Sequence, residues 1–355
     1  MLSLDYEDFA VKIQNLLFLL AISVFLFPIP QKSFAIGPKQ RSRIVVREIA
    51  WSPAGNNIAT VIVEGGVGGA GERVEVYTAQ PFALQGTIPN FPDGDDSTSL
   101  VISDIAWNSN GTQLAIGKNG LGATEPIVEI WDISTTPYQR TLRHIYLDNV
   151  ISGITIAWRP NQQEIAYTCS ERSICILDIA SEEVIHVLTG DAVALTALKY
   201  SPDGELLLAG NGQLWDVDAE EILGTFEQSP YLGPFAWSPD GTQVTFLYEG
   251  QIRIWDAVTR QSVGFLEGTL GYTSDIYWVG QQIISQDFDG KQTKFRVWDQ
   301  KTSHLVDTFE LDASIIVQSF AVNPTGDKLA YGIHAPDPVE DTQVVEIISL
   351  PFETP

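Results

Sequence analysis

The chain has 355 residues and 44% hydrophobic content, so it is long enough to bury a large core. Its 45 acidic and 20 basic side chains give a formal net charge of −25. A surface of this charge repels nucleic acids and anionic lipid headgroups, which argues against nucleic-acid binding, and it attracts cations and basic protein surfaces.

The N-terminal segment has the pattern of a secretory signal. An apolar run over residues 16–27 follows Lys12 and precedes the small-x-small tripeptide Ser33-Phe34-Ala35. A run of about twelve apolar residues is short for a bilayer span but fits the h-region of a signal peptide. We therefore expect residues 1–35 to be a signal peptide, with a short membrane anchor over residues 16–29 as the alternative.

Cleavage would export residues 36–355 to a periplasm, a lumen or the extracellular space, with no stable membrane insertion afterwards. The early acidic residues Asp5, Glu7 and Asp8 are atypical of a signal peptide, whose n-region is positively charged. They favour a true start downstream of Met1.

One pattern occurs seven times between about residues 44 and 350. Its clearest copy runs Phe235-Ala236-Trp237-Ser238-Pro239-Asp240-Gly241, continues through an apolar run over residues 244–247, and closes with Ile254-Trp255-Asp256. The opening aromatic position holds Trp51, Trp107, Trp158, Tyr200, Trp237 and Trp278, with Val322 in the last copy. The closing Trp-Asp recurs at Trp131, Trp215, Trp255 and Trp298. Short strand-like runs repeated at roughly 40–45 residues are typical of the blades of a β-propeller.

Local chemistry supports the same fold. In the Ser-Pro-Asp-Gly steps, Pro fixes φ and Gly takes the positive-φ position of a tight turn. One copy cannot bury both faces of its sheet, so the array is expected to close into a ring. The sequence thus predicts an all-β fold, a seven-bladed β-propeller of four-stranded antiparallel blades that forms a single domain over residues 36–355. The tryptophans of the repeat are expected to fill the core rather than bind a ligand.

The closing Trp-Asp dipeptides and the repeat length resemble the WD-repeat family over about residues 44–350. The copies depart from that family because they lack its opening Gly-His dipeptide; Thr189-Gly190-Asp191 stands where one copy would carry it. The family's buried hydrogen-bond network is therefore not expected. The Trp-Ser-Pro-Asp-Gly phrase is also similar to the repeats of exported Tol-system propellers, which have six blades, but seven copies favour seven blades. The resemblance implies a non-catalytic platform for protein–protein interaction.

The seventh copy lacks a fourth strand. Earlier copies continue after the closing element with a further apolar run, such as residues 220–226, whereas the last has only residues 350–355. We expect residues 36–43 to supply the missing outer strand, with a three-stranded last blade as the alternative.

The two cysteines, Cys169 and Cys175, flank a predicted turn between the second and third strands of copy three. An oxidising compartment permits a disulfide across such a hairpin. Two buried thiols that never meet are the alternative, because the strand register decides whether the side chains face each other.

The hairpins between the second and third strands differ in length around the ring. They are long over residues 64–72, 118–126 and 334–342, intermediate over residues 287–291, and tight at Asn211-Gly212 and Glu249-Gly250. In a closed ring the longer ones form an arc over blades six, seven, one and two, beside the loop that enters blade two. The acidic arc is defined by Glu64, Glu72, Asp93, Asp95, Asp96, Glu125, Asp337, Glu340 and Asp341. We expect it to bind a protein partner with a basic patch, with neutral loop drift as the alternative.

Other chemistry has little support in the sequence. The Gly-rich residues 65–71 lack the Gly-Lys-Ser/Thr ending of a phosphate loop, and Asp93, Asp95 and Asp96 match no complete calcium-ligand spacing. The four histidines fall in predicted outer strands or in a surface loop, at His144, His186, His304 and His334. We therefore expect no metal site, no cofactor and no catalytic residue. An enzyme or a small-ligand or cation-binding propeller is the alternative, because carboxylates from different blades can converge at the channel mouth.

Overall fold

Each copy of the repeat folds into one antiparallel sheet. The structure, a computed structural model, describes residues 44–64, 71–90, 100–120, 126–145, 154–190, 197–226, 234–268, 272–313, 315–333 and 344–350. Within those ranges it contains strands and turns, and no helix long and apolar enough to cross a membrane.

The first three blades are four-stranded sheets with the strands in chain order. Blade one contains β1 (Ile44–Trp51), β2 (Asn57–Glu64), β3 (Arg73–Ala79) and β4 (Phe82–Pro89). Blade two contains β5 (Leu100–Trp107), β6 (Gln113–Gly120), β7 (Ile127–Asp132) and β8 (Gln139–Ile145). Blade three contains β9 (Ile156–Trp158), β10 (Glu164–Ser170), β11 (Ser173–Asp178) and β12 (Glu183–Thr189).

The remaining blades repeat this order. Blade four contains β13 (Leu198–Tyr200), β14 (Leu206–Ala209), β15 (Gln213–Asp216) and β16 (Glu221–Thr225). Blade five contains β17 (Phe235–Trp237), β18 (Gln243–Tyr248), β19 (Gln251–Asp256) and β20 (Ser262–Phe265). Blade six contains β21 (Tyr272–Val279), β22 (Gln282–Phe288), β23 (Thr293–Asp299) and β24 (Leu305–Glu310). Blade seven contains β25 (Val317–Val322), β26 (Lys328–Ile333) and β27 (Val345–Ser349).

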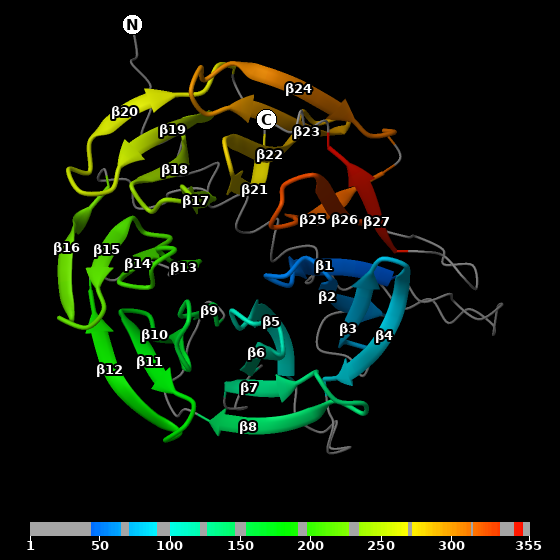
Figure 1. The fold of residues 1–355 in the computed structure, drawn as a ribbon, viewed down its shortest axis with the longest axis vertical. Coiled ribbons are helices and arrows are strands. Elements are labelled where there is room, and N and C mark those ends of the chain that lie inside the picture. Colours follow the sequence, from blue (N-terminus) through cyan, green and yellow to red (C-terminus); the bar gives the residue numbers. More distant parts are fainter. Residues whose placement is uncertain are drawn as a thin grey trace, which may run out of the picture. The chain divides into compact units, whose positions relative to one another are not determined.

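The blades stand in a ring around a common axis, with the first strand of each blade innermost and, in blades one to six, the fourth outermost (Figure 1). Blade seven meets blade one, because the Trp51 indole nitrogen donates to the carbonyl oxygen of Ala321 at 3.1 Å. The amide of Ile49 donates to Ser319 Oγ at 3.2 Å. The predicted seven-bladed propeller is therefore confirmed.

The final blade differs from the four-stranded pattern. Within the described residues its sheet has three strands, in the order β25, β26, β27. Residues 36–43, expected to form an outer strand there, lie outside the described residues. Closure of the last blade by that segment stays a prediction.

The core lies between adjacent blades, where the repeat tryptophans are buried as predicted. All nine are at most 8% exposed. Three inner-strand tryptophans also join blades: besides Trp51, the indole of Trp107 donates to the Ala50 carbonyl and that of Trp237 to the Lys199 carbonyl, each at 3.1 Å. These side chains hold one blade to the next and are not available as a stacking platform.

The Ser-Pro-Asp-Gly turns form as their residues predict. Asp240 Oδ1 accepts hydrogen bonds from Ser238 Oγ at 2.6 Å and from the Thr242 amide at 3.0 Å. Gly241 has φ +71°, in the region that favours glycine. Each such turn connects an inner strand to the second strand of its blade.

Candidate functional site

The structure describes two residues of the acidic arc and places them differently. Glu64 ends β2 with its side chain 38% exposed, 3.3 Å from Arg73 Nη1. Glu72, by contrast, has a side chain that is 0% exposed, and its carboxylate lies 2.7 Å from Arg47 Nη1. Burial raises the pKa of Glu72, while the Arg47 charge acts to lower it. Glu72 therefore departs from the expected exposed rim because it pairs with a cation from the inner strand.

The other arc residues lie outside the described residues: Asp93, Asp95, Asp96, Glu125, Asp337, Glu340 and Asp341. The described strands also shorten two of the expected loops. β6 continues to Gly120, so Lys118 belongs to a strand and is buried. β22 continues to Phe288, so Asp287 is buried in that strand, 2.8 Å from Arg296 Nη2.

A buried polar network lies beneath the arc between blades one and two. Lys118 Nζ is 2.8 Å from Glu129 Oε2 and donates to the Asn90 carbonyl at 2.7 Å. The Asn90 side chain donates to Glu72 Oε2 at 3.2 Å and to the Leu100 carbonyl at 2.8 Å. Arg47 donates to the Ile102 carbonyl at 2.5 Å. Ion pairs and hydrogen bonds therefore hold the described residues at these strand ends in place.

The inner strands are longest in the blades that carry the arc. They have eight residues in blades one, two and six and six in blade seven, but only three in blades three, four and five. All end near the repeat's aromatic position, so the extra residues lie at the end facing the hairpins that join second and third strands. Each long strand also carries a register shift, and such bulges re-aim side chains beside functional sites.

The channel itself contains a cavity of about 770 Å³, lined from six of the seven inner strands. Three carboxylates line it, and each lies three residues before the tryptophan of its strand: Glu48 before Trp51, Asp104 before Trp107 and Asp275 before Trp278. They come from blades one, two and six. The ring thus brings residues that occupy the same position in different repeats, far apart in the chain, to one cavity.

Glu48 and Asp104 form a coupled pair in the channel wall. Asp104 Oδ2 accepts from the Ile156 amide at 2.7 Å and from Thr155 Oγ1 at 2.8 Å, so its ionised form has two donors. Burial raises the pKa of Glu48 well above its ordinary value, and the Asp104 charge raises it further. Burial also raises the pKa of Asp104, whereas its hydrogen bonds act to lower it. Both carboxyls therefore favour the protonated form more than exposed acids do.

The positively charged side chain of Lys199 lines the same cavity. Lys199 Nζ is 3.3 Å from Asp275 Oδ1 and donates to the Phe235 carbonyl at 2.8 Å. It also lies 5.7 Å from the ring centroid of Tyr277, within reach of a cation–π interaction. The Tyr277 hydroxyl donates to the Phe320 carbonyl at 3.1 Å, and burial raises its pKa. The channel therefore offers both charges and a phenol to a small molecule.

The comparisons with known proteins agree with this architecture. No protein-family profile matches the chain. Actin-interacting protein 1 of Drosophila melanogaster is 29% identical over 32% of this chain and 20% of its own length. The WD repeat-containing protein srw1 of Schizosaccharomyces pombe is 21% identical over 62% and 46%, and WD repeat-containing protein 1 of Xenopus tropicalis is 25% identical over 38% and 24%.

A chain in the crystal structure of a mitotic checkpoint complex has a TM-score of 0.63 and 16% identity, covering 87% of this chain and 96% of that chain. Identity this low shows the fold alone. The repeated Trp-Asp and the seven-bladed ring agree with these likenesses. The chain is a seven-bladed β-propeller that is similar to WD-repeat proteins. It spans from a fifth to about half of the length of these curated relatives.

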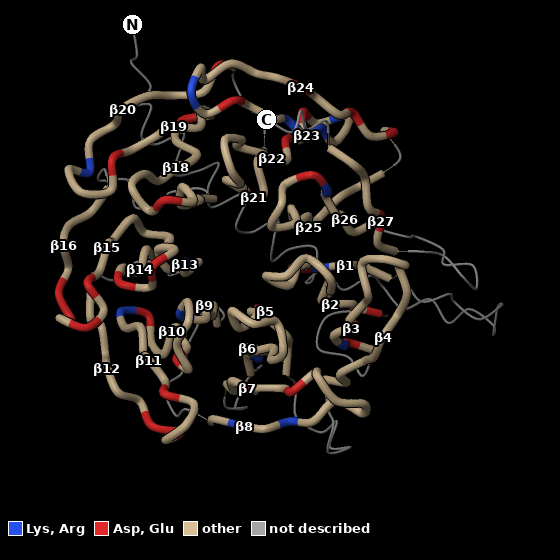
Figure 2. Tube along the Cα trace, viewed as in Figure 1, with Lys and Arg blue, Asp and Glu red and all other residues tan. Residues whose placement is uncertain are grey.

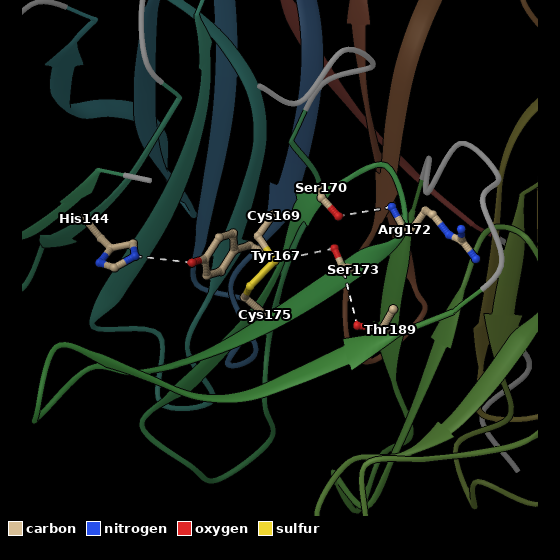
Figure 3. The surroundings of a disulfide bond; sticks show 8 residues. All are labelled: His144, Tyr167, Cys169, Ser170, Arg172, Ser173, Cys175 and Thr189. Atoms are coloured by element: carbon tan, nitrogen blue, oxygen red, sulfur yellow. Dashed lines mark hydrogen bonds between the residues drawn. A yellow bond between two sulfur atoms is a disulfide. The ribbon is translucent and has the colours of Figure 1, made fainter. Parts of the chain in front are cut away.

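The propeller holds its two cysteines in a disulfide. Cys169 of β10 and Cys175 of β11 are bonded, with Cα atoms 5.7 Å apart (Figure 3). Cys169 lies at a register shift of the β10–β11 pair, which brings it toward Cys175. Nearby, the Tyr167 hydroxyl and His144 Nε2 are 3.2 Å apart, joining blade three to the outer strand of blade two.

The histidines of the propeller are dispersed. His144 lies in β8, His186 in β12 and His304 immediately before β24, while His334 lies outside the described residues. Among the described residues no group of three or more His, Cys, Asp or Glu side chains has an arrangement that could hold a metal ion.

Sequence reasoning missed the channel carboxylates as individual residues. It anticipated only that carboxylates of different blades can converge. Aligning the copies on the opening aromatic residue reveals the signal, since the position three residues earlier holds Glu48, Asp104, Thr155, Ala197, Pro234, Asp275 and Ser319. Three of these residues are acidic and lie on strands that face the channel. Their convergence could therefore be predicted once a closed ring is assumed.

Proposed function

We propose that this chain is a non-catalytic protein-interaction platform, exported to the cell envelope or outside the cell, that binds a partner on the loop-bearing face over blades six, seven, one and two. One observation carries the choice of face. Among the described residues, the inner strands have six to eight residues in these four blades and three in the other three. Unequal strand lengths make the surface that a rigid scaffold offers to a partner asymmetric.

The charge of the chain supports a basic partner. The eight acidic residues of the arc other than the buried Glu72, together with the formal net charge of −25, attract a surface rich in Lys and Arg. The buried network of Lys118, Glu129, Asn90, Glu72 and Arg47 fixes the strand ends from which the arc departs. Because these strand ends are already held in place, binding a partner beside them costs less conformational entropy.

The relatives support the same class of role without naming the partner. One is named for its interaction with actin, and the similar solved chain belongs to a checkpoint complex. We propose interaction with another protein here, and not with those partners.

Export is supported by two separate features. Residues 16–27 are apolar and are followed by Ser33-Phe34-Ala35, as in a cleaved signal peptide. The Cys169–Cys175 disulfide is a bond that persists in oxidising compartments. N-terminal sequencing of the protein recovered from cells tests this directly: a start near Ile36 supports export, and a start near Met1 on a soluble protein contradicts it.

The docking face is tested by capture from the native cell envelope after mild crosslinking. The test variant replaces residues 65–70, 121–125 and 335–341 with tight turns, which spares Lys118 and the buried network beneath. A matched control neutralises exposed acids of blades three to five, with Glu171, Glu205 and Glu249 changed to Gln. We expect the intact protein and the control to retain a partner that the trimmed variant loses. Equal capture by all three contradicts the proposed face.

The channel carboxylates favour a second candidate function, the binding of a small molecule or cation in the cavity. Glu48, Asp104 and Asp275 come from separate blades to one cavity that also contains Lys199. A thermal-shift screen with calcium and common cofactors discriminates between the two, because a ligand that binds only the folded state raises the melting temperature. A large rise in melting temperature that is lost in Asp104→Asn or Asp275→Asn supports ligand binding in the channel. If no ligand raises the melting temperature, the loop-bearing face remains the proposed site.

A further inference from the structure

The outer strands share a bulge at one repeat position. In blades one to six, the pairing of the third and fourth strands skips one residue of the fourth strand. The skipped residues are Gln85, Thr141, Ile185, Leu223, Val263 and Val306. A bulge interrupts the regular hydrogen-bonding edge of a sheet, so the fourth strands are poor templates for the addition of another strand. A partner would instead contact their exposed side chains.

The bulge residue changes character around the ring. It is polar in blades one and two and aliphatic in blades three to six, where it remains 38–55% exposed. Phe265 of β20 and Leu305 of β24 are exposed beside it as well. On β12 and β16, the outer strands of two neighbouring blades, five aliphatic residues are 38–49% exposed: Val184, Ile185, Val187, Ile222 and Leu223. A group of exposed large aliphatic residues marks an interaction site more often than isolated ones do.

Blades three and four also share a short acidic motif. Two glutamates precede the aliphatic pair in each, as Glu182-Glu183-Val184-Ile185 and Glu220-Glu221-Ile222-Leu223. All four glutamates are exposed, and Figure 2 shows acidic residues gathered at the start of β16 and of β12. The corresponding positions of blades five and six hold Arg260-Gln261 and Ser303-His304. The combination of acidic and apolar residues is therefore particular to two neighbouring blades.

A contact between side chains joins the two acidic motifs, and an arginine lies at one end of them. His186 Nδ1 of β12 lies 2.7 Å from Glu220 Oε1, in the turn before β16. This contact connects the rims of blades three and four. Arg260, from the corresponding turn of blade five, lies against Gly224 of β16, where a Cβ atom would be 2.5 Å from its Nε. Arg260 thus ends the acidic surface on that side.

We propose that β12, β16 and the turns before them form a second docking surface, which takes an amphipathic segment of a partner protein with one apolar and one Lys/Arg-rich side. The apolar side contacts the five aliphatic residues, and the cations pair with the four glutamates. Charge complementarity selects this occupant: a second copy of a chain with net charge −25 would be repelled, and so would a nucleic acid. This surface lies on the ring's circumference and does not depend on the acidic arc.

The probe is a synthetic 18-residue helical peptide of Leu and Lys with all Leu on one face, titrated into the full-length chain by fluorescence anisotropy. Two variants test the two parts of the surface. One carries Glu182→Gln, Glu183→Gln, Glu220→Gln and Glu221→Gln, and the other carries Ile185→Ser and Leu223→Ser. We expect each to weaken binding by about tenfold or more, as loss of charge or apolar contacts at the centre of an interface does. Circular dichroism confirms that each variant is folded.

Matched controls distinguish binding at this surface from a general attraction of the basic peptide to an acidic chain. Glu171→Gln, Glu205→Gln, Glu249→Gln and Glu267→Gln together remove the same charge from elsewhere, and Leu305→Ser with Val306→Ser alters the aliphatic rim of blade six. Both should bind the peptide as the unmodified chain does. Equal weakening by the controls, or equal binding of a scrambled peptide whose Leu are spread around the helix, overturns the proposal. The arc-trimmed variant should bind normally, so failure here and failure of the loop-face proposal are distinguishable.

Discussion

The amide nitrogen of Ile156, in blade three, donates to Asp104 Oδ2, in blade two, at 2.7 Å. The same relationship recurs between other neighbours. The Ile105 amide of blade two donates to Glu48 of blade one at 3.4 Å, and the Ile49 amide of blade one donates to Ser319 of blade seven. One repeat position therefore both lines the channel and holds the next blade. Glu48 and Asp104 therefore join neighbouring blades whatever the cavity binds.

Replacing Asp104 with Ala should destabilise the fold, because it leaves the Ile156 amide and the Thr155 hydroxyl without their acceptor. We expect a loss of about 2–3 kcal/mol in the free energy of unfolding, the cost of an unsatisfied buried donor. Asp104→Asn keeps an acceptor oxygen and should lose less. Urea denaturation measures both; equal losses would mean that the carboxylate's hydrogen bonds do not hold blade three.

Glu48 should make stability decrease as pH rises. Its folded pKa is raised by burial and by Asp104, so the folded state favours the protonated form. The destabilisation is absent below the ordinary glutamate pKa and grows as pH rises from there toward the raised folded value. Glu48→Gln removes this penalty and should stabilise the protein at pH 8 by on the order of 1 kcal/mol relative to its effect at pH 4.

Melting curves of Glu48→Gln and of a control, Glu221→Gln on exposed β16, measure the difference across this pH range. A pH profile of Glu48→Gln that parallels the unmodified protein would show that Glu48 ionises in the folded state without cost.

The number and order of blades could be predicted from the sequence because their signals are local. Trp237 and the Ser-Pro-Asp-Gly turn after it act within one copy, and repetition shows that the copies stack. Glu72 could not be placed in the same way. It stands in a Gly-rich segment like Glu64, and its partner Arg47 is on another strand, so nothing local distinguishes a buried acid from an exposed one. The channel site depends on ring closure, which brings together residues as distant as Glu48 and Asp275.

The tight hairpin of blade five offers a stabilising substitution. Glu249 has φ +50° and Gly250 has φ +75°, the pattern of a type I′ turn, in which Asn-Gly is preferred. Glu249→Asn should stabilise the protein by about 0.5–1 kcal/mol, since Asn tolerates positive φ. The side chain is exposed and its 3.5 Å ion pair with Arg253 contributes little. Glu249→Gln, which keeps the strain, should show no gain in thermal unfolding; a gain equal to that of Asn would rule out the turn as the cause.

The Cys169–Cys175 disulfide should stabilise blade three by closing a short loop. Changing both residues to Ala is expected to cost about 2 kcal/mol, as loop-closure estimates give for a loop of this size. Adding reductant to the unmodified protein should move its urea midpoint toward that of the variant, while the variant itself should not respond. An unmodified protein that is insensitive to reductant and has two reactive thiols when denatured would show that the bond does not form.

Lys118 and Glu129 should be coupled in stability because both are buried and 2.8 Å apart. Burial lowers the pKa of Lys118, while the Glu129 charge acts to raise it. Lys118→Met leaves Glu129 in the interior with only Arg140, at 3.1 Å, as a charged partner, and should cost about 3–5 kcal/mol. Adding Glu129→Gln should recover part of that loss, because it removes a buried charge that has lost the nearer of its two cationic partners. Denaturation of the single and double variants gives the coupling energy, and purely additive losses would mean that the two charges do not stabilise each other beneath the arc.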